Sequence, residues 1–263
     1  MKKTILPALA MLIVAAVMLS TASYAWFAIS SNVTAEGMNV TIKSESEYLL
    51  IMPVNSTYDA TEANKTQVLA DIRGINKFSA EGIAIGSTAL YPAAHKTGMT
   101  AADIETLSTT NTSSWYTAIA ANAGESDMKE GSEKYLDSLN NYVVKYRYIV
   151  SMAQGSTPKT GLWIDGIDIG FATTKGLDDT INPVKVIVTC GSNLYEHGKD
   201  NSTNVMSTIP TTAFAGEIDE NIFYEFDVYV FYDGNHPDVF TDNFIDLVGA
   251  TISISLTTTN PNS

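Results

Sequence analysis

Short runs of β-branched and aromatic residues, each bounded by turn residues, recur along most of this chain. Two of the runs alternate strictly between apolar and polar side chains, which is typical of a strand with one buried face. The pattern predicts strands at residues 38–43, 48–52, 82–86, 142–150, 162–164, 184–189, 223–232 and 251–256. Many short strands with turns between them predict an all-β fold, either a jelly roll or another β-sandwich.

Helical patterning is confined to two stretches. Residues 99–107 include Thr100, a candidate N-cap, with Asp103 three residues later, and predict a helix of two turns. Residues 132–139 predict a second short helix, whereas residues 55–66, 108–114 and 199–207 are polar and predict loops. We therefore expect a single β-domain over residues 37–263, with helix- and loop-containing insertions near residues 55–80 and 95–140.

Residues 1–25 have the pattern of an export signal, with a basic start and a following apolar run. Ser23 and Ala25 satisfy the small-x-small rule of signal peptidase, and cleavage there leaves Trp26 as the first residue. Cleavage after Ala22 and an uncleaved membrane anchor are the alternatives. The prediction is a secreted protein, extracellular or on the cell surface, that meets signal peptidase during export and touches the membrane only before cleavage.

Charge and cysteine content exclude several classes of function. The 263 residues include 15 Lys and Arg against 29 Asp and Glu, giving a net charge of −14 at pH 7. Such a surface does not attract nucleic acid or anionic membrane, so neither is an expected partner. The single cysteine, Cys190, excludes an internal disulfide framework and a Cys-based zinc or iron–sulfur site. Its place at a predicted strand end indicates a buried, inert thiol or, alternatively, a bridge between subunits.

No pattern in the chain predicts catalysis. A Gly-x-Ser-x-Gly elbow, a glycine-rich phosphate loop and an HExxH motif are all missing from the sequence. His95, His197 and His236 lie next to turn residues and are not spaced to share one zinc ion, so we expect exposed loop histidines. The chain is therefore not expected to be an enzyme.

The junction between the signal and the domain carries a family resemblance. Residues 23–29 read Ser-Tyr-Ala-Trp-Phe-Ala-Ile, and residues 32–40 read Asn-Val-Thr-Ala-Glu-Gly-Met-Asn-Val. This segment resembles the start of the TasA/camelysin family of exported, fibre-forming bacterial proteins. Residues 228–234 followed by Asp238, and the Leu-Tyr-Pro at residues 90–92, resemble segments of clostridial relatives.

The resemblance implies a jelly-roll subunit of an extracellular fibre or biofilm matrix. In such pilus-like filaments, the mature N-terminus of one subunit fills a groove in the next, so each subunit's partners are copies of itself, joined head to tail. The family name also carries a metalloprotease classification. That activity needs converging histidine or carboxylate ligands and a general base, which the histidine spacing here does not predict.

Residues 26–36 suit the role of a donated strand. Trp26, Phe27, Ile29 and Val33 are apolar and follow the predicted cleavage site directly. The last three share one face at a period of two, so an added strand could place them in a foreign core. The alternative is an ordinary first strand in the sheet of its own subunit. The residues alone do not distinguish the two, and the resemblance favours donation.

An acidic loop is the one candidate for a bound ion. Oxygen ligands for calcium are available from Asp233, Asn235, Asp238 and Asp242. The spacing is not that of an EF-hand, and ordinary turn chemistry is the favoured explanation of such a run. No other cofactor is expected.

These observations leave a leading function and two alternatives. The leading prediction is a secreted structural subunit that polymerises by donating its N-terminal strand. The first alternative is a monomeric surface adhesin or ligand-binding sandwich, with the two insertions as its contact face. The second and less favoured alternative is a camelysin-like metalloprotease.

Overall fold

The computed structural model describes residues 39–44, 48–85, 91–118, 133–170, 184–198, 212–234 and 250–261. The predicted export signal and donor strand lie outside these residues, as does the predicted loop at 199–207. Every run predicted to be a strand overlaps one, and the all-β class is confirmed. In the described part of the chain, no helix has the length and apolar character needed to span a membrane.

One sheet has four strands in the order β3-β1-β13-β9. In this order the strands span Ser79–Glu81, Asn39–Ser44, Thr251–Thr257 and Trp163–Gly170. β1 runs parallel to β13, whereas β3 and β9 are antiparallel to their neighbours. The first and last described strands are thus neighbours at the centre of this sheet.

The second sheet is antiparallel and has the order β11-β10-β12-β8-β2, with the short β4 also paired to β8. The strands of this path span Asn193–His197, Val184–Cys190, Phe223–Tyr232, Val143–Met152 and Leu49–Val54, and β4 spans Ala84–Ile85. The bounds of β12 are those that the run of aromatic and branched residues predicts.

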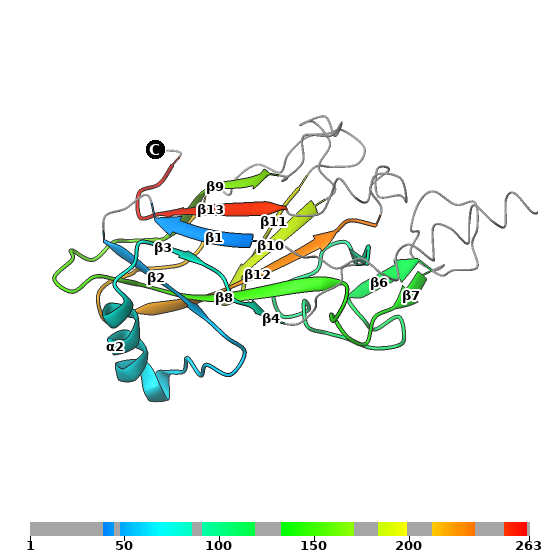
Figure 1. Ribbon diagram of the computed structural model, residues 1–263, viewed down its shortest axis with the longest axis horizontal. Helices are drawn as coiled ribbons and strands as arrows, with labels where there is room; N and C mark the ends of the chain where they lie inside the picture. Colours follow the sequence, from blue (N-terminus) through cyan, green and yellow to red (C-terminus); the bar gives the residue numbers. More distant parts are fainter. Residues whose placement is uncertain are drawn as a thin grey trace, which may run out of the picture.

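The two sheets pack face to face around one hydrophobic core, forming a β-sandwich (Figure 1). Alternation along each long strand decides which side chains enter this core. On β8 the inward-facing side chains are those of Val144, Tyr146, Tyr148, Val150 and Met152. The side chains between them, including Lys145 and Arg147, lie on the outer face of the six-stranded sheet.

Main-chain hydrogen bonds close one side of the sandwich. The amide of Ser44 in β1 donates to the carbonyl of Phe78, and the amide of Ile51 in β2 donates to the carbonyl of Lys77, each over 2.8 Å. Residues 77–78 therefore connect β1 of one sheet with β2 of the other at this side of the sandwich.

Helix α2 (Lys65–Ile75), preceded by the 3-10 turn η2 (Glu62–Asn64), covers one end of the outer face of the six-stranded sheet (Figure 1). Val68 and Ile72 of the helix pack against outward-facing residues of β2 and β8. Asn76 ends the helix in a left-handed conformation, with φ of 49°. Confining helical patterning to residues 99–107 and 132–139 was therefore wrong, because this helix lies in the insertion near residues 55–80.

The other insertion contributes a small sheet of β5 (Ala94–His95), β6 (Trp115–Ala118) and β7 (Glu133–Tyr135). It covers the other end of the same outer face, where a second cluster contains Trp115 from the insertion and Phe231 from β12. Figure 1 shows β6 and β7 beyond the ends of the long strands, away from α2.

Neither helix predicted in this second insertion is present. The carboxylate of Asp103 accepts hydrogen bonds from the amide and the hydroxyl of Thr100, at 3.1 and 2.6 Å, but the chain makes only turns there. The carbonyl of Thr106 accepts a hydrogen bond from the amide of Ser114, which ties this turn to the residues just before β6. The predicted helix at 132–139 is replaced by β7, which pairs with β6. Tertiary pairing overrides the local propensity in both places.

Candidate functional site

The side of the sandwich opposite the closed one has two edge strands. β9 is the last strand of one sheet and β11 the last of the other. Both begin beside the same stretch of chain, because Ala215 bridges to Leu162 just before β9 and the carbonyl of Phe214 accepts a hydrogen bond from Asn193 of β11. Beyond these starts, no described strand pairs with the outer edge of either one. Unpaired edges of this kind are ready templates for another strand.

His197 lies on β11 beside this open side. It pairs with Val186, a core residue, so its side chain is on the inter-sheet side of the strand. The residue is only 5% exposed; its Nδ1 lies 3.3 Å from the Tyr195 hydroxyl, while Nε2 has no hydrogen-bond partner among the described residues. Burial lowers the pKa of His197, and the carboxylate of Asp168 on β9 opposes that shift. The prediction of an exposed loop histidine was therefore wrong here, because the residue belongs to a strand.

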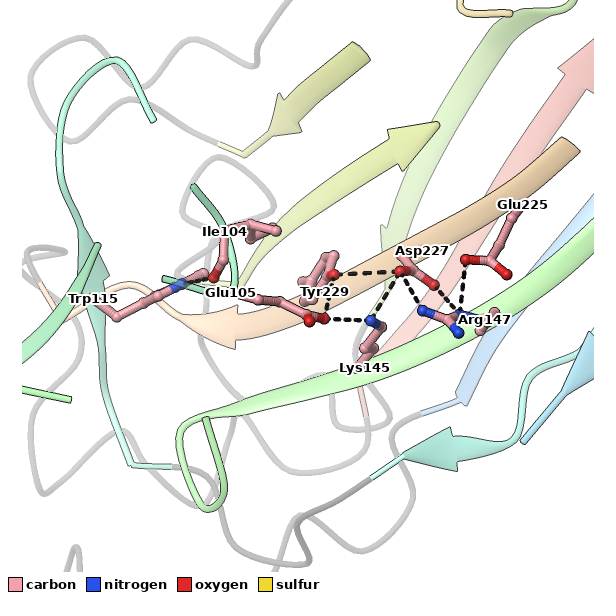
Figure 2. Close-up of polar contacts among 8 residues, drawn as sticks. All are labelled: Ile104, Glu105, Trp115, Lys145, Arg147, Glu225, Asp227 and Tyr229. Carbon is pink, nitrogen blue, oxygen red and sulfur yellow. Dashed lines mark hydrogen bonds and ion pairs between the residues drawn. The ribbon is translucent and has the colours of Figure 1, made fainter. Parts of the chain in front are cut away.

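A cluster of charged residues crosses the centre of the outer face, on β8 and β12 (Figure 2). We name it the Asp227 cluster; its members are Glu105, Lys145, Arg147, Glu225, Asp227 and Tyr229. Arg147 donates two hydrogen bonds to the carboxylate of Asp227, one from Nε over 2.7 Å and one from a terminal guanidinium nitrogen over 3.0 Å. Lys145 Nζ lies 2.9 Å from the same carboxylate. Such forked, charge-assisted pairs fix geometry as well as charge.

Glu105 connects this cluster to the insertion that contains β5 and β6. It forms an ion pair with Lys145 and accepts a hydrogen bond from the Tyr229 hydroxyl over 3.1 Å. The neighbouring residue, Ile104, accepts a bond of 2.7 Å from the indole nitrogen of Trp115 (Figure 2). The Asp227 cluster thus clamps the insertion to the sheet from one side.

The ionisation of the cluster is fixed by its partners. Burial alone would raise the pKa of Asp227, but the hydrogen bonds from Arg147 and Lys145 lower it. Glu225 is the exception, because burial outweighs Arg147 and raises its pKa. The basic groups are paired with carboxylates, which suits a structural clamp better than proton transfer.

A second ionic group holds the insertion from its other side. We name it the His95 cluster; it consists of His95, Lys185, Glu196 and Asp233. His95 Nε2 lies 3.0 Å from Glu196, and Lys185 Nζ lies 3.1 Å from Glu196 and 3.0 Å from Asp233. The ring of His95 packs edge-on against Trp115 and Phe231. His95 is therefore a half-buried strand residue, and the prediction of an exposed loop histidine was wrong for it too.

Most of the predicted site residues lie outside the described part of the chain. These are the cleavage residues Ser23 and Ala25, the donor residues Trp26, Phe27, Ile29 and Val33, His236, and the calcium candidates Asn235, Asp238 and Asp242. Asp233, the remaining calcium candidate, has a side chain only 3% exposed and is paired with Lys185. Among the described residues, no group of three or more potential metal ligands comes together.

Sequence reasoning missed both ionic clusters. Lys145 and Arg147, and Glu225 and Asp227, alternate with apolar residues inside runs that were interpreted only as strands. Opposite charges at alternate positions of two long strands are a usable signal, since neighbouring strands place such residues side by side.

A comparison with protein-family models, curated proteins and solved structures finds no match to this chain.

Proposed function

We propose that this protein is a secreted structural subunit of an extracellular surface fibre or biofilm matrix. In this proposal the sandwich is a jelly roll, and each subunit donates residues 26–36, after signal cleavage, to the open side of a neighbour. The observation that carries the proposal is the pair of edge strands β9 and β11, which flank the same side of one core. An incoming strand forms main-chain hydrogen bonds with such an edge, and every second side chain of that strand can enter a pocket in the core.

The dimensions of donor and acceptor agree. Residues 26–33 extended as a strand span about 26 Å, at roughly 3.3 Å per residue. β9 also has eight residues, so its edge offers an equal length. Phe27, Ile29 and Val33 would face the core, while the opposite face of the donated strand would remain outside. The contact is heterologous and does not close, so repetition yields a filament.

Two features of the described residues support this arrangement. The buried Nε2 of His197 lacks a partner beside the open side, and a donated strand would bring polar main-chain groups to it. β1, which follows the donor segment in sequence, is paired on both edges and held within its own subunit. A subunit could therefore donate residues 26–36 to a neighbour while its own β1 stays paired with β3 and β13.

Electron microscopy of two purified chains tests the proposal. One chain starts at Trp26 and the other at Met38, which removes the donor segment. We expect filaments from the first and separate particles from the second. Separate particles from both chains would contradict the proposal and would favour the monomeric adhesin.

Cysteine cross-linking locates the contact. In a Cys190→Ala background, one chain carries Ile29→Cys and a second carries Ile169→Cys on β9. We expect oxidation of the mixture to join the two chains. A matched chain with Ser79→Cys on β3, at the closed side, should not be joined. Equal cross-linking at both positions would rule out an acceptor site between β9 and β11.

A further inference from the structure

We propose that the His95 cluster is a pH-dependent latch, which holds β5 of the insertion on the edge strand β11 in mildly acidic and neutral solution and releases it in alkaline solution. The latch is a property of the folded subunit and does not depend on fibre formation.

Both ring nitrogens of His95 face hydrogen-bond acceptors. Nδ1 lies 2.9 Å from the carbonyl oxygen of Lys96, and Nε2 lies 3.0 Å from a carboxylate oxygen of Glu196. A neutral imidazole has one N–H group, so it can satisfy only one of the two and turns a lone pair toward the other. The doubly protonated ring satisfies both. The arrangement therefore selects the charged form of His95.

The charges around the ring lead to the same conclusion. β11 contributes Glu196, β10 contributes Lys185, and Asp233 follows the end of β12. With His95 protonated, these four groups sum to zero, whereas a neutral His95 leaves one uncompensated negative charge in a largely buried site. An uncompensated buried charge is costly, which favours opening of the contact.

The other groups around His95 do not counter this effect. Trp115 and Phe231, which pack against the ring from β6 and β12, carry no charge. The amine of the adjacent Lys96 is directed to the carbonyl of Asn111 and the ring of Tyr135. Burial alone would lower the pKa of His95 and Lys185 opposes protonation, but Glu196 outweighs both and the pKa is raised.

Besides the His95 cluster, packing and main-chain hydrogen bonds attach the segment of residues 93–96 to the sandwich. Ala93 is buried with Phe231 of β12 in one hydrophobic cluster, and the His95 ring packs edge-on against Phe231. Ala93 also exchanges two main-chain hydrogen bonds of 2.9 Å with Tyr232 and Gly234. The clamp at Glu105 lies on the other side of the insertion and does not lose its charge in alkaline solution, because a lowered pKa keeps that carboxylate ionised. Release of the latch should therefore open residues 93–96 locally and leave the Asp227 cluster intact.

Hydrogen exchange of the purified protein between pH 6 and 9 tests the proposal. The amide of Ala93 donates to Tyr232 of β12 and reports the attachment of the segment to the sandwich, and the amide of Lys96 donates to Ser114 and reports the place of β5 within the insertion. After correction for the intrinsic pH dependence of exchange, we expect their protection to fall by up to about tenfold per pH unit above pH 6.5, because opening releases one proton. Unchanged protection across this range would overturn the proposal without the need for any variant.

Two variants sharpen the result. His95→Gln should make the protection of residues 93–96 low and independent of pH. Glu105→Gln is the matched control, because it weakens the other clamp but should leave the pH dependence of residues 93–96 intact. Titration of His197 does not imitate the effect, since burial lowers its pKa and places its titration on the acid side of the window. A pH dependence that survives in His95→Gln would overturn the assignment to His95.

Discussion

The hydroxyl group of Tyr148 crosses the core of the sandwich and donates a hydrogen bond to the main-chain carbonyl of Val40 over 2.8 Å. Tyr148 belongs to β8 of the six-stranded sheet and is fully buried, and Val40 belongs to β1 of the four-stranded sheet. The same carbonyl accepts a bond of 2.7 Å from the amide of Gly82. One oxygen thus connects both sheets at the strand that follows the N-terminal segment.

Removing this hydroxyl should destabilise the fold measurably. We expect Tyr148→Phe to lower the free energy of unfolding by about 1–2 kcal/mol, because a buried hydrogen bond is lost while Val40 keeps its bond to Gly82. Urea denaturation provides the measurement. Tyr224→Phe is the control, since its hydroxyl also donates to a main-chain carbonyl but does so at an exposed site. Equal costs for the two variants would contradict a special role for the Tyr148 bond.

The contact also explains why residue 82 is a glycine. A Cβ atom at this position would lie 2.2 Å from the Tyr148 hydroxyl and 2.6 Å from the ring of Tyr146. Both rings are held in the core, so we expect Gly82→Ala to cost about 1–3 kcal/mol through overpacking. Gly166→Ala is the matched control, because nothing lies within 4 Å of its Cβ position. A melting temperature unchanged by Gly82→Ala would show that Tyr146 and Tyr148 can shift to accommodate the added methyl group.

Much of the sandwich is predictable from sequence because its strands are long and strongly patterned. Residues 223–232 combine aromatic and branched side chains over a run too apolar for a surface segment, and the strand has those bounds. Helix α2 could also have been predicted from the sequence, since Val68, Leu69 and Ile72 have the spacing of one helical face. The polar residues before it led to the prediction of a loop.

Other features depend on partners that are distant in sequence. β6 and β7 are short strands that exist through their pairing with each other, and local patterning carries little information about them. The same limit applies to the His95 cluster, whose residues come from four separate segments. A histidine beside turn residues gives no sign that a glutamate about 100 residues away, Glu196, will face it. The parallel pairing of β1 with β13 likewise joins the two ends of the domain.

The single thiol should be unreactive in the folded protein. Cys190 is buried at the end of β10, and burial raises its pKa to about 12 from 9.0. Because the thiolate is the reactive form, the thiolate fraction at pH 8 should be about a thousandfold smaller than in the unfolded chain. We expect a maleimide to label Cys190 only as fast as the protein opens, and immediately in denaturant. Rapid labelling of the folded protein would instead favour a thiol available for a bridge between subunits.

Acid should weaken the His95 cluster through Glu196. Burial alone would raise the pKa of this carboxyl group, but His95 and Lys185 lower it to about 2 from 4.5. The folded state therefore holds the deprotonated form more strongly than the unfolded chain does, so the stabilisation is present above pH 4.5 and is lost as pH falls toward 2. The shift corresponds to roughly 3 kcal/mol.

Comparison of the wild-type protein with Glu196→Gln isolates this contribution from those of other carboxylates. Both proteins are unfolded in urea at a series of pH values from 7 to 2. The difference in unfolding free energy should be largest at neutral pH and should shrink as the pH falls below 4.5, because protonation makes the wild-type side chain resemble the variant. Glu62, an exposed residue paired with the half-buried Lys65, supplies a control. Glu62→Gln removes a surface ion pair and should change stability by less than about 1 kcal/mol at any pH. A difference that stays constant down to pH 2 would mean that Glu196 stabilises the fold by packing and not by its charge.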